Sequence, residues 1–598
     1  MRHLATCAFL AAACSLAFAQ SPADVRGMAS LPRSEMEPVL RGFDADRGAL
    51  MRAFPASDSP EHAARLRAYD ESTIAGLDAM PFDSMTLEAK VDWVMLRNFA
   101  RHSLHQLDVA AKELTLTTDL VPFAPELLAF AEARRRITPG NPRLAADDLD
   151  ALRVKVDQAR TRLAKALDER KEAPAAAERS AARRSWLLLE RLRRSLRDWH
   201  AFRDGYDPLF SWWTREPFKA AEHALDAHAD LIKERLMGVT AQTPDPIIGV
   251  PIGREALEAE LRFAMIPYTP EELLAIGERE FAWCQAELKK AAADMGCGDD
   301  WRKALELTKR AHVEPGEQPA LIRELADDAV RFLKANDLIT VPPMAEETWR
   351  MEMMSPERQR VAPFFLGGES IIVSFPTDTM CHADKCMSMR GNNRHFAHAT
   401  VFHELIPGHH LQQFMNARSM VHRAIFDTPF WMEGWALHWE MLMWDKGYHA
   451  TPMDRMGALF WRTHRCARIV FSIKFHLGEM TPQECVDLLV DRVGHERANA
   501  EGEIRRSLSG DYGPTYQLAY MVGGLQFRAL HKELVGSGRM TDRDFHDAII
   551  KGNSMPVEMI RALLTRQAPG REFVTSWRFD EALNPPAASP SPAREPAR

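Results

Sequence analysis

The sequence predicts a mainly α fold built of many helices, with one small β-sheet. Over long stretches leucines recur at steps of three, four and seven residues, the spacing that puts side chains on one face of a helix. In contrast, residues 370–375 form a β-branched run between glycine and proline, which is the pattern of a strand. No repeat of fixed period stands out.

The first 19 residues have the pattern of a secretory signal peptide. Arg2 and His3 precede an apolar run that is too short to span a bilayer, and Ala17-Phe18-Ala19 is a small-x-small cleavage signal. Cys14 raises the alternative of a lipoprotein, but the apolar run before it is short. We expect cleavage after Ala19, a periplasmic or secreted protein, and no membrane span in the mature chain.

Size and composition suit a large helical core. The chain has 598 residues, of which 46% are hydrophobic. We expect one large domain over residues 20–583, with an N-terminal helical part to about residue 240 and a metal-site part over about 241–583. Residues 584–598, rich in Pro, Ala and Ser, should be disordered. The net charge of −8 and the lack of a basic stripe argue against a nucleic-acid partner.

Two helical segments are well marked in the first half of the chain. Leucine periodicity on both sides of Pro174 predicts a helical hairpin over residues 148–202. The run Thr269-Pro270-Glu271-Glu272 is a capping box with proline at the first helical position, so a helix should begin at Pro270.

Residues 401–412, VFHELIPGHHLQ, hold the densest group of potential metal ligands. In the usual zinc-peptidase motif two His lie four residues apart on one helix, with Glu after the first. Here the residue four positions after His403 is Pro407. On an unbroken helix His409 would turn away from the face of His403. His410 would return to that face about 10.5 Å along the axis, too far away to share one ion.

The Pro407-Gly408 pair resolves this conflict. Proline removes a backbone donor, and glycine tolerates the dihedral angles of a bulge. We therefore expect the helix to be interrupted at residues 405–408 and to resume near His409. His409 is the favoured second ligand after His403, and His410 remains the alternative.

The segment FWMEGWALHWE, residues 430–440, supplies the third ligand. Glu433 follows His410 at a distance that allows a loop and a returning helix. Gly434 would keep this helix slim where it faces the first helix, and Glu440, two turns on, would orient a ligand histidine.

Two imidazoles and a carboxylate form the ligand set of a catalytic zinc that keeps one position open. We therefore expect Zn²⁺ at His403, His409 and Glu433. Glu404, beside the first histidine, is the candidate general base.

HELIPGHHLQ together with EGWALHWE resembles the bacterial domain-of-unknown-function family 885, which looks like a distant branch of the gluzincin metallopeptidases. The resemblance covers about residues 35–580 and includes an Ala-Tyr-x-x-Gly pattern at Ala519, Tyr520 and Gly523. It implies a metallopeptidase-like helical fold around a buried groove and peptidase activity. It also implies that Tyr520 is an oxyanion donor and that His403, Glu404, His409 or His410, and Glu433 form the metal centre.

This chain departs from the family pattern at two places. The family often has Pro-Gly-Gln before the Ala-Tyr pair, where this chain has Pro514-Thr515-Tyr516. The usual Arg-x-x-x-Asp-x-Gly run begins here at Arg468, with Ser472 and Lys474 in place of Asp and Gly. Both changes leave the metal centre intact and affect only the implied substrate contacts.

In the peptidases that the chain resembles, an edge strand before the metal motif pairs with the substrate backbone. Residues 370–375 are therefore a candidate for that role beside the active-site groove, and a buried strand without substrate contact is the alternative. Nearby, Arg390, Arg394, His395 and His398 would make the groove cationic and receptive to a substrate carboxylate.

Six cysteines remain after signal cleavage, in a compartment expected to be oxidising. Cys381 and Cys386 flank four residues and are the predicted disulfide. A metal clip with His382 is the alternative.

Together these features predict zinc-dependent hydrolysis of peptide bonds in exported peptides. Glu404 would take a proton from water and pass it to the leaving amine. Tyr520, His476 or His438 would stabilise the oxyanion.

Two other functions stay open: a zinc hydrolase acting on a non-peptide amide, and a metal-binding protein without catalysis. Glu404 disfavours the second, because a structural zinc site is closed by four protein ligands and needs no base.

Overall fold

The structure, a computed structural model, describes residues 34–583 except residues 139, 242, 244, 360, 361, 363, 509 and 511. The predicted signal peptide and C-terminal tail lie outside the described residues. The mainly α prediction is confirmed, since many helices surround a single two-stranded sheet in the described ranges. Within those ranges no helix combines the length and apolarity needed to cross a membrane.

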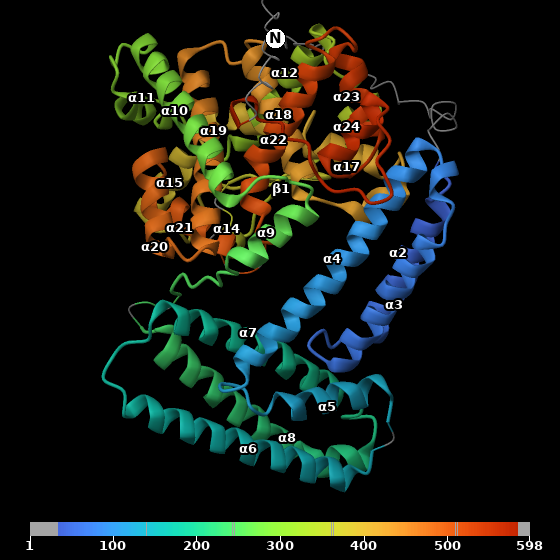
Figure 1. Ribbon diagram of the computed structural model, residues 1–598. Coiled ribbons are helices and arrows are strands. Elements are labelled where there is room, and N and C mark those ends of the chain that lie inside the picture. Colours follow the sequence, from blue (N-terminus) through green and yellow to red (C-terminus); the bar gives the residue numbers. More distant parts are fainter. Residues whose placement is uncertain are drawn as a thin grey trace, which may run out of the picture.

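The N-terminal helices form an elongated part of the molecule (Figure 1). A long helix, α4, runs from the upper part of the molecule down to a separate bundle made of α5 to α8. The elements are α2 (Glu37–Ala53), α3 (Pro60–Asp78), α4 (Leu87–Thr117), α5 (Ala124–Arg135), α6 (Pro142–Asp168), α7 (Ala176–Ala201) and α8 (Pro208–Leu231).

Within this bundle the predicted hairpin over residues 148–202 is only half right. Both helices form, as α6 and α7, but α6 packs along α8 and α7 packs along α5. Leu149 of α6 and Leu192 of α7 are both buried in the one core that these helices share. Leucine spacing marks the face that a helix buries, but it carries no information about which helix covers that face.

The remaining helices build the larger, upper part of the molecule (Figure 1). As predicted, α10 begins at Pro270 with a capping box between Thr269 and Glu272. The elements are α9 (Arg254–Phe263), α10 (Pro270–Asp294), α11 (Trp301–Lys309), α12 (Gln318–Ala335), α13 (Pro343–Thr348), α14 (Pro356–Gln359), α15 (His382–Gly391), α16 (Arg394–Glu404), α17 (His409–Asn416), α18 (Pro429–Asp445), α19 (Pro452–His476), α20 (Pro482–Leu488), α21 (Arg497–Leu508), α22 (Tyr516–Leu534), α23 (Asp542–Lys551) and α24 (Val557–Thr565).

The sheet consists of β1 (Arg350–Met353) and β2 (Ser370–Val373), which run parallel with Arg350 opposite Ser370. The strand predicted at residues 370–375 is therefore present and slightly shorter. On the other side of β2, Leu366 and Ile372 exchange backbone hydrogen bonds. Ile372 is thus paired with the protein itself on both sides.

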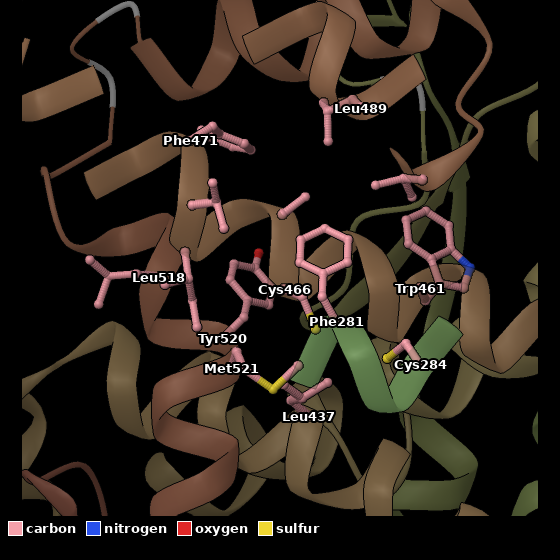
Figure 2. Close-up of a cluster of buried hydrophobic side chains, with 14 of the residues drawn as sticks. Phe281, Cys284, Leu437, Trp461, Cys466, Phe471, Leu489, Leu518, Tyr520 and Met521 are labelled. Carbon is pink, nitrogen blue, oxygen red and sulfur yellow. The ribbon is translucent and has the colours of Figure 1, made fainter. Parts of the chain in front are cut away.

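Helices α18, α19 and α22 meet in the main core (Figure 2). Phe281, Leu437, Trp461 and Leu518 are packed in the buried cluster that also contains Tyr520. Burial of these large side chains supplies the hydrophobic stabilisation that fixes the three helices.

Gly434 makes the contact between α18 and α22 unusually close. A Cβ added to Gly434 would lie 2.6 Å from the carbonyl carbon of Gly523, so neither position has room for a side chain. The expectation that Gly434 faces the helix carrying His403 is therefore wrong. It faces the helix that carries the cavity tyrosines described below.

A buried ion pair ties the N-terminal part to the larger part. Arg423, in the short helix Val421–Phe426 between α17 and α18, donates from Nε to Asp92 of α4 over 2.7 Å. Arg423 also pairs with Glu88, and His422 Nε2 lies 3.4 Å from Asp92. Arg423 is 1% exposed and Asp92 is fully buried. Removing either side chain would therefore leave an uncompensated buried charge.

We expect Asp92→Ala to lower the free energy of unfolding by about 3 kcal/mol, because it leaves the buried Arg423 without its fully buried carboxylate partner. Urea unfolding followed by fluorescence measures the change. Glu37→Ala is the control, since its pair with Arg41 is exposed and should contribute below about 0.5 kcal/mol. Equal effects of the two substitutions would contradict a structural role for the buried pair.

Candidate metal centre

The helix that carries the motif is interrupted where the sequence predicted. Helix α16 ends at Glu404 and α17 begins at His409. Leu405 has φ −110° and ψ −106°, which is outside the helical region. The chain reconnects across the break, since the Gly408 N–H donates to Phe402 and the Leu411 N–H donates to Leu405.

Gly408 is required at this break. A Cβ added to it would lie 1.7 Å from the carbonyl oxygen of His403, so any side chain would collide with the backbone. The close approach brings the start of α17 against the last turn of α16. As a result the two histidines on either side of the break come together.

The side chains of His403, His409 and Glu433 converge on one point. Oε2 of Glu433 lies 3.6 Å from Nε2 of His403 and 3.3 Å from Nε2 of His409. Glu404 is close as well, since it and the two histidines offer ligand atoms that all lie within 4.8 Å of one another. All three predicted metal ligands and the predicted base are thus gathered at one place.

His410 points elsewhere. Its Nδ1 lies 3.2 Å from the carbonyl oxygen of Gly368, and its Nε2 lies 2.9 Å from that of Ala345. Successive residues on a helix are rotated by about 100°, so His409 and His410 cannot face the same point. Of the two alternatives left by the sequence, His409 is the one placed beside His403.

Further side chains hold these groups in position. Glu440 lies 2.7 Å from Nδ1 of His403, as its spacing from Glu433 predicted, and it accepts a hydrogen bond from Arg465. The Tyr516 hydroxyl donates to Oε1 of Glu433. Contacts of this kind fix the orientation of ligating groups.

The electrostatics of the cluster favour positive charge between the carboxylates. Burial opposes protonation of His403, but Glu433 and Glu440 outweigh it and raise its pKa to about 9. Burial acts to raise the pKa of Glu433, yet the two histidines hold it well below its usual range. For Glu404 burial dominates and raises the pKa of its carboxyl group.

A cavity of about 230 Å³ opens beside this cluster. Tyr520 lines it, with its ring parallel to that of His403 at 6.2 Å. Of the other two predicted oxyanion donors, His438 lies 3.0 Å from His546 and is buried, and neither His438 nor His476 is among the lining residues.

The wall nearest Glu404 comes from the segment before β2 and not from β2 itself. Phe364, Phe365, Leu366 and Gly367 line the cavity. Gly367 lies so close that an added Cβ would be 2.5 Å from the Glu404 carbonyl oxygen. Residues 370–375 are not among the lining residues. Of the two alternatives left by the sequence, the structure favours the strand without substrate contact.

Tyr516 is a site residue that the sequence prediction missed. It precedes Tyr520 by four positions on α22, so both rings lie on one helix face and both line the cavity. That spacing was visible in the sequence, but its link to Glu433 depends on the contact between α18 and α22.

The basic residues before the motif do not reach the cavity. Arg390 pairs with Glu306 and Glu496, and Arg394 pairs with Glu324. His395 contacts Asp454 and His398 contacts His449. The predicted cationic groove wall of these four residues is therefore wrong, because each has a partner in a neighbouring helix or loop.

The disulfide predicted between Cys381 and Cys386 is wrong as well, since both cysteines are free. Cys386 Sγ lies 3.7 Å from Nε2 of His382. Cys381 is the N-cap of α15, and Cys386 lies within that helix.

We expect Gly408→Ala to lower the free energy of unfolding by more than about 1–3 kcal/mol, because its methyl group would overlap the His403 carbonyl. Gly42→Ala is the matched control. It lies within α2 with open space around it, so alanine should be neutral or stabilise by about 0.5–1 kcal/mol. Urea unfolding of both variants measures whether the free energy of unfolding falls or rises. An unchanged value for Gly408→Ala would contradict the close approach of Gly408 to the His403 carbonyl oxygen.

Comparison with known proteins agrees with this architecture. Two solved structures share the fold. One is described as a "putative lipoprotein of unknown function" from Shewanella oneidensis, with a TM-score of 0.64, 16% identity, and coverage of 88% of this chain and 98% of that chain. The other is described as a "putative lipoprotein" from Colwellia psychrerythraea, with a TM-score of 0.55, 14% identity, and coverage of 85% and 91%.

No protein of curated function matches the sequence. The family model described as "Bacterial protein of unknown function (DUF885)" matches residues 53–564, which is most of the chain and includes every residue of the candidate site. The chain therefore belongs to the DUF885 family of bacterial proteins.

Proposed function

We propose that this protein is an exported zinc-dependent hydrolase that cleaves peptide bonds. The observation that carries the proposal is the convergence of two buried imidazole nitrogens on one buried carboxylate oxygen, with Glu404 beside them and a cavity in front. Two histidines and one carboxylate are the protein ligands of many catalytic zinc sites, and they leave one coordination position open.

The donor set fits a metal ion. Oε2 of Glu433 is buried and has no hydrogen-bond partner among the described residues. A buried carboxylate oxygen without a donor is costly, and a divalent cation between it and the two Nε2 atoms would remove that cost. His403, His409 and Glu433 would hold the ion, while Glu440 and Tyr516 keep two of these ligands in place.

A bound zinc ion would supply Lewis-acid chemistry, by lowering the pKa of a water molecule and polarising a carbonyl group. Glu404 accepts the proton of the attacking water and returns it to the leaving amine, a role that its raised pKa suits. The Tyr516 hydroxyl already donates to Glu433, so Tyr520 is the better donor for the developing oxyanion.

Export of the chain rests on two observations. The first 19 residues have the signal-peptide pattern, and both structural neighbours are described as putative lipoproteins. We place the mature protein in the periplasm or outside the cell, where its substrates would be peptides.

The adjacent histidines at positions 409 and 410 allow the ligand assignment to be tested. We expect the wild-type chain to bind one zinc ion and His409→Ala to lose it, because His409 faces Glu433. His410→Ala is the adjacent control and should retain zinc, because His410 contacts the carbonyl groups of Gly368 and Ala345. Metal content after dialysis, measured by mass spectrometry, decides between them. Loss of zinc in the His410 variant alone would reverse the assignment.

The role of Glu404 is tested separately from metal binding. We expect Glu404→Gln to keep zinc and to lower kcat about 10²–10⁴-fold on a peptide library, because the amide cannot accept the proton of water. Zinc content and turnover are measured on the same preparation. Normal peptide hydrolysis by this variant would rule out Glu404 as the base. Turnover of non-peptide amides alone would assign the same centre to another substrate class.

A further inference from the structure

Two guanidinium groups line the cavity and share a single carboxylate. Arg468 of α19 donates from Nε to Glu503 over 2.8 Å, and Arg506 of α21 donates to the same carboxylate over 2.6 Å. Glu503 is fully buried behind them. Arg358 of α14 lines the same cavity. Arg358, Arg468 and Arg506 thus all contribute guanidinium groups to the cavity wall.

Arg468 has binding capacity that the protein does not use. It is 2% exposed, and its Nη1 has no hydrogen-bond partner in the described part of the chain. A buried charged donor that is left unsatisfied costs free energy, so this Nη1 calls for an acceptor. An anion in the cavity would accept this hydrogen bond.

The position of Arg468 relative to the metal centre limits what that anion is. The Tyr520 ring is close to both, with its centroid 6.2 Å from that of the His403 ring and 4.1 Å from Cζ of Arg468. By these two distances Arg468 lies within about 10 Å of His403. An extended peptide advances about 3.3–3.6 Å per residue, so only one or two residues fit between a bond at the metal centre and a group at Arg468.

We propose that Arg468 and Arg506 bind the C-terminal carboxylate of a peptide, so that the enzyme releases one or two residues from C-terminal ends. The proposal rests on the peptide hydrolysis proposed above. Water adds across the C–N bond, giving a new carboxylate on the longer product and a free amine on the released piece. Guanidinium groups match carboxylates in geometry and charge, and their hydrogen bonds are stronger in a buried site.

The other arginines near the motif cannot take this role. Arg390 has two carboxylate partners of its own, and Arg394 is paired on the outside with Glu324. Arg468 differs because it lines the cavity and its Nη1 has no hydrogen-bond partner among the described residues. Arg394 is therefore a suitable control position.

The test uses the full-length zinc-loaded protein and three peptides. These are an N-acetylated alanine hexapeptide with a free C-terminal carboxylate, the same peptide as its C-terminal amide, and an amide in which the last residue is Glu. We expect kcat/KM for the free acid to exceed that for both amides at least about tenfold, and the released products to be one or two residues long. A Glu-amide that matches the free acid would overturn the terminal assignment in favour of a side-chain carboxylate.

Substitutions at the arginines test whether they cause the preference for a free C-terminal carboxylate. We expect Arg468→Met to reduce the ratio of free acid to amide to about one while hydrolysis of the amide persists. Arg506→Met should lower the same ratio, and it serves as the second variant where the first does not fold. Arg394→Met should retain the wild-type ratio. Circular dichroism checks folding of each variant.

A binding measurement tests the carboxylate site independently of the proposed peptidase activity. Calorimetric titration of the two alanine hexapeptides into Glu404→Gln measures the preference without turnover, and we again expect at least about tenfold tighter binding of the free acid. If Glu404→Gln prefers the free acid but the wild-type protein hydrolyses neither peptide, the carboxylate site is supported and the proposed peptidase activity is contradicted. Equal binding and equal kcat/KM for acid and amide would overturn the carboxylate site and leave the peptidase standing.

Discussion

The contact of the Gly408 backbone with the His403 carbonyl oxygen governs the geometry of the candidate site. It lets α17 begin directly against the end of α16, so that His409 is rotated back towards His403. In a regular helix the same two residues would point in different directions. The break therefore converts two helix-surface histidines into a converging pair, and Glu433 from α18 completes the group.

A second constraint brings the helix that carries Tyr516 and Tyr520 to this pair. The glycines at 434 and 523 allow α18 and α22 to pack almost backbone to backbone. Tyr516 thereby reaches Glu433, while Tyr520 lies beside the His403 ring. A single methyl group at the crossing would separate these elements, so the position of the tyrosines depends on two residues that have no side chain.

Charge balance is the third feature of the cavity wall. Behind His403, Arg465 and Glu440 form a matched pair. Further along, Arg468 and Arg506 both pair with Glu503, and the buried Nη1 of Arg468 has no hydrogen-bond partner among the described residues. Because Arg468 is buried, this unsatisfied donor has a strong effect on what binds beside it. The wall thus has a matched ion pair near His403 and an unsatisfied guanidinium donor at Arg468, which an anionic peptide terminus would recognise.

The sequence alone determined what depends on short-range rules. Helical periodicity predicted the fold class, the capping box placed the start of α10, and the Pro-Gly pair located the break beside His409. These features follow from the backbone preferences of a few neighbouring residues.

Only the tertiary structure decided which of His409 and His410 lies beside Glu433, the packing partners of α6 and α7, and the identity of the cavity cations. The sequence analysis expected Arg390 and Arg394 to be cavity cations, yet both are paired elsewhere, with partners up to 106 residues away. Contacts between distant helices decide which cation keeps an unsatisfied donor. Residue spacing along the chain does not predict those contacts.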